Sequence, residues 1–108
     1  MTKINILGQE YEILKQSESE NPKLEEADGL CEIYSHKIVL REFEKTRNSY
    51  ENLEDYKQKV LRHEIIHAFF AESGLRNNSD YAENEELVDW IAIQLPKIVK
   101  VMNELDIL

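Results

Sequence analysis

The most constraining feature of this chain is the run His63-Glu64-Ile65-Ile66-His67, which spells H-E-x-x-H inside a stretch typical of a helix. Residues four positions apart on an α-helix lie one turn apart on nearly the same face, so both imidazoles can reach one ion. Neutral imidazole nitrogen is a good ligand for Zn²⁺, and Glu64 lies where it can take a proton from a metal-activated water. The motif therefore predicts a metal-binding helix and indicates hydrolytic chemistry.

The residues around the motif predict a long, covered helix. Ser49 or Asn52 can cap its start, and Gly74 supplies a left-handed residue to end it. Residues 65–71 are apolar at almost every position, which is typical of a helix covered on all sides. We expect the two phenylalanines of this stretch, and Trp90 further along, to lie in the core.

The part of the chain before this helix is rich in strand-forming residues. Residues 3–15 alternate loosely, with a turn expected at Gly8-Gln9, and Gly29–Arg41 predicts a second hairpin around the polar break Ser35-His36-Lys37. The acidic stretch Gln16–Asp28 predicts a loop with at most one helical turn, and residues 44–48 a polar linker. Strands followed by helices predict an α+β fold, with a small antiparallel sheet packed on the motif helix.

After the motif helix the sequence predicts two more helices. Leu75–Asp80 reads as a polar loop, and Asp80-Tyr81-Ala82-Glu83 matches a capping box that opens a helix running to about Leu95. Pro96 has no amide hydrogen, so it should end or kink this helix, and Lys97–Leu105 should form a last short one. No repeat or low-complexity tract interrupts the 108 residues, which are expected to form one domain.

A catalytic zinc site needs a third protein ligand, and acids at the start of the second helix can supply it. Glu85 shares a helical face with Val88 and Ala92, where a carboxylate is costly unless it is paired or bound to metal. Glu86 lies on a more mixed side. The pattern favours Glu85 and leaves Glu86 open; Glu83 and Asp89 are further acids of this segment.

The motif, the Gly74 stop and the segment Glu85–Pro96 together resemble the minimal gluzincin peptidases, most closely the ImmA/IrrE-type domain of phages and mobile elements. The resemblance covers roughly Gly29–Pro96. It implies a sheet ahead of the H-E-x-x-H helix and a ligating glutamate near the start of the next helix. Arg76–Asp80 departs from the pattern, because the family usually has an apolar-aromatic segment there.

The resemblance also implies a function, the zinc-dependent hydrolysis of peptide bonds. One Zn²⁺ would be held by the two motif histidines and Glu85, and it would activate a water and polarise the scissile carbonyl. Glu64 would act as general base and pass the proton to the leaving amine. The oxyanion needs a second donor besides the metal, for which Tyr81 and His36 are candidates.

Two other functions stay open. Peptide deformylases also use H-E-x-x-H, with a cysteine from an upstream strand, and Cys31 lies on such a strand. A lone strand cysteine is more often a small buried hydrophobe. Alternatively, a non-catalytic protein of phage or mobile-element type would keep the metal for stability and bind a protein or peptide partner.

The composition of the chain restricts the kinds of partner that it can bind. The chain has 13 basic and 22 acidic residues and a net charge of −9, which argues against nucleic acid and against an anionic membrane surface. No stretch approaches 18 consecutive apolar residues, so no membrane span is expected. The single cysteine excludes an intrachain disulfide, and the first residues lack the apolar run of a signal peptide. Together these features predict a cytoplasmic protein; the oligomeric state stays open.

Overall fold

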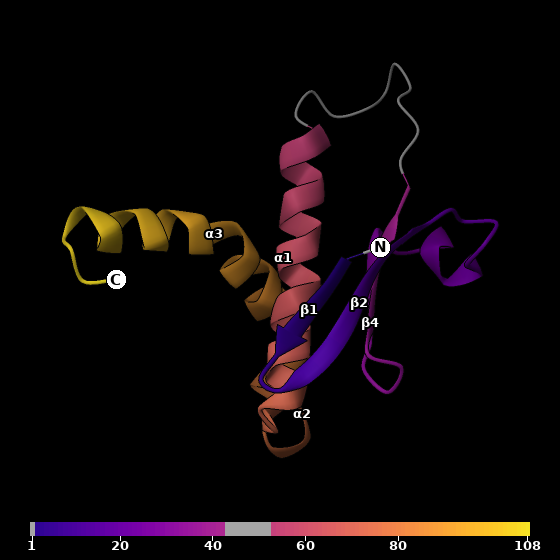
Figure 1. The fold of residues 1–108 in the computed structure, drawn as a ribbon, viewed down its shortest axis with the longest axis horizontal. Helices are drawn as coiled ribbons and strands as arrows, with labels where there is room; N and C mark the ends of the chain where they lie inside the picture. The colour runs from indigo at the N-terminus through magenta and orange to yellow at the C-terminus, as the bar shows by residue number, and fades with distance from the viewer. Residues whose placement is uncertain (1, 43–52) are drawn as a thin grey trace.

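The fold is a four-stranded sheet with one long helix packed against it and a second long helix packed against the first, seen in a computed structural model that describes residues 2–42 and 53–108 (Figure 1). The α+β class predicted from the sequence is confirmed. The expected linker and the two expected caps of the motif helix fall outside the described residues. In chain order the elements are β1 (Thr2–Ile6), β2 (Gln9–Gln16), the 3₁₀ turn η1 (Pro22–Glu25), β3 (Gly29–Glu32), β4 (Lys37–Arg41), α1 (Leu53–Glu72), α2 (Leu75–Asn78), the 3₁₀ turn η2 (Tyr81–Glu83) and α3 (Glu85–Glu104).

The sheet has the strand order β1-β2-β4-β3 and is mixed. Both predicted hairpins form, because β1 pairs with β2 and β3 with β4 in antiparallel fashion. The expectation of a purely antiparallel sheet is wrong at its centre, where β2 and β4 run parallel with Ile13 opposite Ile38. The connection from β2 through η1 leads to β3 at the edge of the sheet, and the chain then returns as β4, which lies between β2 and β3. Consecutive buried residues Ile38, Val39 and Leu40 then fill the centre, as expected of a strand covered on both faces.

The turns follow the local sequence closely. Leu7 and Gly8 both have positive φ, 51° and 93°, which matches a two-residue hairpin turn with the twist of its strands, so the expected Gly8-Gln9 turn was one residue late. The acidic stretch contains one helical turn, η1, as predicted, and the side chain of Asn21 caps it by accepting from the Lys23 amide.

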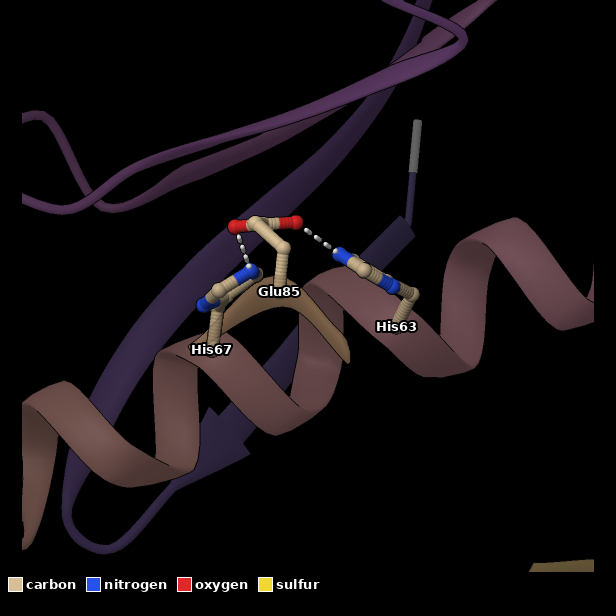
Figure 2. A group of neighbouring side chains, drawn as sticks. All are labelled: His63, His67 and Glu85. Carbon is tan, nitrogen blue, oxygen red and sulfur yellow. Dashed lines mark hydrogen bonds and ion pairs between the residues drawn. The ribbon is translucent and has the colours of Figure 1, made fainter. Parts of the chain in front are cut away.

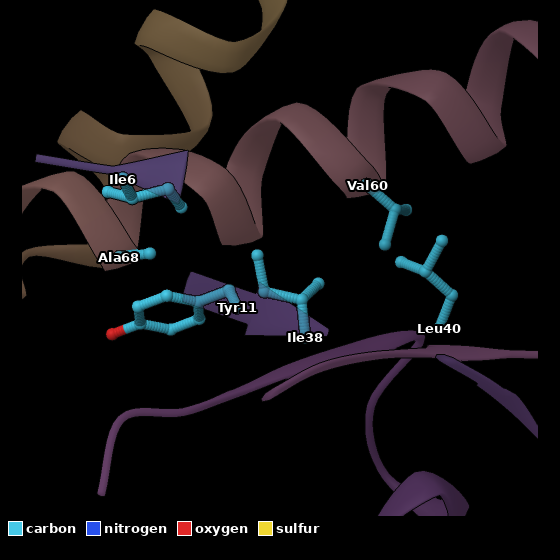
Figure 3. Close-up of a cluster of buried hydrophobic side chains, with 6 residues drawn as sticks. All are labelled: Ile6, Tyr11, Ile38, Leu40, Val60 and Ala68. Atoms are coloured by element: carbon cyan, nitrogen blue, oxygen red, sulfur yellow. The ribbon is translucent and has the colours of Figure 1, made fainter. Parts of the chain in front are cut away.

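The core lies between one face of the sheet and α1 (Figure 3). Tyr11 is completely buried, and its hydroxyl donates to Glu72 Oε2 at 2.7 Å, tying β2 to the end of α1. The expectation that α1 is covered on all sides is wrong, because Phe69 is exposed, and Trp90 on α3 is exposed as well. The sheet and α3 cover only part of the circumference of α1. The buried cluster consists of Ile6, Tyr11, Ile38, Leu40, Val60 and Ala68.

The start of α3 differs from the prediction. Gly74 ends α1 with a φ of 85°, as expected, but the capping box at Asp80 opens only the 3₁₀ turn η2 and makes no side-chain cap. The cap of α3 is Asn84, whose Oδ1 accepts from the Leu87 amide at 2.8 Å. The expected loop after Gly74 also contains the short helix α2.

The helix α3 continues through Pro96, so the expected separate last helix is wrong. Proline removes the amide that would pair with the carbonyl of residue 92. Arg62 of α1 replaces this donor, because its Nε donates to the Ala92 carbonyl at 2.7 Å. In Figure 1 α3 changes direction along its length, and its second half runs away from the sheet and α1. The proline therefore bends the path of α3 without ending it.

Candidate metal centre

The two motif histidines lie on one side of α1 and face the first residue of α3 (Figure 2). One carboxylate meets both rings: Glu85 Oε2 lies 2.9 Å from His63 Nε2, and Glu85 Oε1 lies 2.8 Å from His67 Nε2. The ligand atoms of these three residues all lie within 4.8 Å of one another. Three groups able to hold a metal ion thus converge on one point.

Helix packing selects Glu85 from the acids of this segment. The Asn84 cap makes Glu85 the first residue of α3, and Val88 and Ala92 on the same face are fully buried. Glu85 and Glu86 are both exposed, but only the carboxylate of Glu85 belongs to the converging group. Cys31, the third residue considered as a ligand, lines the same cleft but also lies outside that group. The apolar face of the helix was therefore the useful signal in the sequence.

A second carboxylate orients the first histidine. Asp89, one turn after Glu85, lies with its Oδ1 3.2 Å from His63 Nδ1 and 3.0 Å from Lys59 Nζ. Burial works to raise the pKa of Asp89, but the hydrogen bond and charge of Lys59, together with His63, hold it below its ordinary value. An ionised Asp89 can accept the Nδ1 proton of His63, and Nε2, which faces Glu85, would then be the nitrogen that binds a metal, an arrangement typical of metal-ligating histidines.

The motif glutamate is the buried acid of the group. Only 7% of Glu64 is exposed, and burial raises its pKa to about 7; His63 opposes this shift and Glu85 adds to it. Gly29 of β3 lies directly against it, since a Cβ at this position would come within 3.2 Å of Glu64 Oε2. Burial also lowers the pKa of His67, although Glu85 works against this, which favours the neutral imidazole that binds metal.

A cleft of about 530 Å³ opens in front of these residues, between β3 and the two helices. Leu30, Cys31 and Ile33 form one wall. Arg76 is the only lysine or arginine among the described residues that line it, and its Nε lies 3.3 Å from Glu83 Oε1. Arg76 was not among the predicted site residues, because no motif marks it and only the placement of α2 brings it to the cleft.

The two candidates for an oxyanion donor do not line this cleft. Tyr81 is exposed on η2. His36 lies in the turn between β3 and β4, where its ring packs edge-on against Tyr11 with the centroids 5.4 Å apart. Nothing in the sequence indicates where the side chains of Tyr81 and His36 point, because neither belongs to a motif. In the structure Tyr81 is exposed and His36 packs against Tyr11.

Comparison with known proteins adds no relative: no family model, no curated protein and no solved structure matches this chain. A search of the helices in the described residues finds none with the length and hydrophobicity that crossing a bilayer requires. What can be inferred about function therefore comes from the geometry of His63, His67 and Glu85 and the cleft beside them.

Proposed function

We propose that this protein is a zinc-dependent metallopeptidase that hydrolyses peptide bonds. One observation carries the proposal: two imidazoles and a carboxylate converge within 4.8 Å, and the buried carboxylate of Glu64 adjoins them. The likeness to the ImmA/IrrE-type domain, which rests on the motif and the spacing to Glu85, agrees with this interpretation. The cytoplasmic location predicted from the sequence stays a prediction.

The donor set fits zinc. Two neutral histidines and one carboxylate are a common ligand set of catalytic zinc sites, which leave a fourth position open. His63, His67 and Glu85 would hold the ion, and Asp89 would fix the orientation of His63. A bound zinc ion would supply Lewis acidity, polarising a carbonyl and making water more acidic.

Side chains of this protein carry out the proton transfers and stabilise the oxyanion. Glu64 takes a proton from the attacking water and gives it to the leaving amine, so the same carboxyl group serves first as base and then as acid. We assign the second oxyanion donor to Arg76, in place of Tyr81 and His36, because it is the cation of the cleft. Its ion pair with Glu83 limits where the guanidinium can lie.

The metal site is tested by zinc content and affinity in matched variants. Wild type and Glu86→Ala should each bind one zinc ion per chain, whereas Glu85→Ala should lose affinity by about 100-fold or more. Cys31→Ser should keep its zinc; loss of zinc in this variant would instead support the deformylase-like site. A wild-type protein that stays free of zinc when zinc is offered would overturn the proposal.

Hydrolysis is tested with Glu64→Gln, which keeps the shape of the side chain and removes the base. Zinc-loaded wild type and variant are incubated with a mixture of random-sequence peptides, and new termini are counted by mass spectrometry. We expect cleavage by wild type and a loss of about 10²–10⁴-fold in the variant, with zinc content unchanged.

A non-catalytic, metal-stabilised binding protein is the second candidate, and the low exposure of Glu64 favours it. Gly29 of β3 lies directly against Glu64, so water reaches this carboxylate less readily than it would reach an exposed one. If fully zinc-loaded wild type cleaves no more peptide bonds than Glu64→Gln, the binding protein is the correct interpretation and the peptidase is not.

A further inference from the structure

Three successive turns of α1 face two successive turns of α3 at the metal centre. Residues four positions apart share one face of a helix, and this spacing recurs on both helices. Glu85 of α3 lies between the two motif histidines. Asp89 lies in the same way between His63 and Lys59. Basic and acidic side chains therefore alternate along the contact between the helices, in a set that we name the interhelical row: His67, Glu85, His63, Asp89 and Lys59.

Lys59 ends this row, and its one link to the metal centre is the carboxylate of Asp89. The Nζ atom of Lys59 lies 3.0 Å from Asp89 Oδ1, and the same oxygen lies 3.2 Å from Nδ1 of His63. The other ring nitrogen of His63, Nε2, faces Glu85 (Figure 2). One carboxylate oxygen thus joins the ammonium of Lys59 to the side of the His63 ring that is turned away from the proposed metal position.

Asp89 benefits from a second partner because water can reach it. Its side chain is 39% exposed, and it borders a hollow of about 220 Å³ beside the metal centre. With His63 as its sole partner, the carboxylate could turn toward water and release the ring. The ammonium of Lys59 adds a charge-assisted contact to the oxygen that faces the ring, and charged contacts of this kind are stronger than neutral ones.

The position of Lys59 is defined by a neighbour on the same helix. Its Nζ lies 5.3 Å from the centre of the Tyr56 ring, within the range of a cation–π contact. The hydroxyl of Tyr56 donates to Asp28, the residue before β3, so the sheet in turn fixes the ring. The ammonium is therefore held on two sides, by the Tyr56 ring and by Asp89, and it can fix the carboxylate that it contacts.

We propose that Lys59 is a positioning residue of the proposed zinc site, on which this inference rests: through Asp89 it holds the His63 ring in the orientation in which Nε2 can bind a metal. Partners directly behind metal ligands typically change metal affinity by about 10–100-fold. Lys59 acts one contact further away, so we expect an effect of about tenfold. Its charge alone predicts the opposite sign, because a cation near the site repels Zn²⁺.

The first test measures the zinc affinity of the full chain by competition with a chelator. Lys59→Met should weaken zinc binding by about tenfold. Lys59→Arg keeps the charge and the donors, so its affinity should stay within about threefold of wild type. Lys57→Met is the matched control, because Lys57 lies on the other side of α1 in an ion pair with Glu54 and should not affect zinc. Circular dichroism checks that each variant keeps its helix content.

A double-mutant cycle tests whether Lys59 acts through Asp89. Asp89→Ala should weaken zinc binding by about 10–100-fold, and adding Lys59→Met to it should not weaken binding further. Nuclear magnetic resonance of the zinc-loaded protein then follows the Nδ1 proton of His63. This proton should exchange with water slowly in wild type and faster in Lys59→Met, with the ring signals of His67 as the internal reference.

Three results in a protein that binds zinc would overturn the role of Lys59. Lys59→Met could bind zinc as tightly as wild type or more tightly, or Lys57→Met could weaken binding as much as Lys59→Met. Alternatively, Lys59→Met could weaken binding equally with aspartate and with alanine at position 89. A wild type that binds no zinc would overturn the metal site and the role of Lys59 together. A zinc-loaded wild type that cleaves no peptide would overturn the peptidase alone.

Discussion

Replacing Arg62 by methionine would remove the donor that keeps α3 continuous at Pro96. The change keeps most of the aliphatic stem and deletes the hydrogen bond from Arg62 Nε to the Ala92 carbonyl, 2.7 Å long. No helical amide can take its place, because residue 96 is a proline. We therefore expect a clear loss of stability from a single partly exposed side chain.

The magnitude follows from the burial of the acceptor. A hydrogen bond from a charged donor contributes about 1.5–3 kcal/mol, and a buried carbonyl left unpaired costs about 1–3 kcal/mol. Ala92 is completely buried, so water cannot readily replace the guanidinium. Arg62→Met should lower the free energy of unfolding by about 2 kcal/mol. In a Pro96→Ala background the new amide pairs with the Ala92 carbonyl, and the same change should cost less than about 1 kcal/mol.

Urea unfolding of the four proteins of this cycle measures the coupling, with a chelator present so that metal binding does not contribute. Lys57→Met, on the same helix in an ion pair with Glu54, is the control and should cost less than about 0.5 kcal/mol in both backgrounds. If Arg62→Met costs the same with proline and with alanine at position 96, the explanation for the continuity of α3 is refuted.

Three further changes test the surroundings of the site by unfolding experiments. Gly29→Ala places a Cβ 2.8 Å from Val60 Cγ1, so it should push β3 off α1 and cost about 1–3 kcal/mol; unchanged stability would contradict the close packing. Burial raises the folded-state pKa of Glu64 from 4.5 to about 7, so folding takes up a proton in this window and stability falls as pH rises through it. Zinc-free Glu64→Gln should therefore exceed wild type by about 3 kcal/mol at pH 8 and match it near pH 4, and a pH-independent difference would count against this. Asn84→Ala removes the cap on the Leu87 amide and should cost about 1 kcal/mol, whereas Asn84→Asp should cost much less.

The sequence predicted well wherever a local pattern carries the information. Gly74 ends α1 because a left-handed residue is needed there, and both hairpins form around polar or glycine-containing breaks. The apolar face containing Val88 and Ala92 indicated which glutamate would face α1. That Glu85 ligates a metal remains a prediction, as does the catalytic role of Glu64.

The sequence-based prediction was incomplete or wrong where contacts between distant segments determine the structure. Pro96 was expected to end or kink the helix, and it bends α3 without ending it, because Arg62, thirty residues before Ala92, donates to the Ala92 carbonyl that the proline leaves unpaired. The parallel pairing of β2 with β4 depends on where the chain crosses, which strand propensity does not encode. Arg76 carries no motif, and it reaches the cleft only because α2 folds back beside α1.

What the sequence determined by itself is the histidine pair, because a spacing of four residues places two side chains on one face of any helix. The tertiary structure decided what meets that pair: it brings both rings to Glu85 of α3, which the sequence only favoured over Glu86, and it places Asp89 behind His63 and Gly29 of β3 over Glu64. The physical reason is that helical periodicity is a property of neighbouring residues, whereas these contacts join residues 18 or more positions apart, and only the packing of α1 against β3 and α3 brings them together.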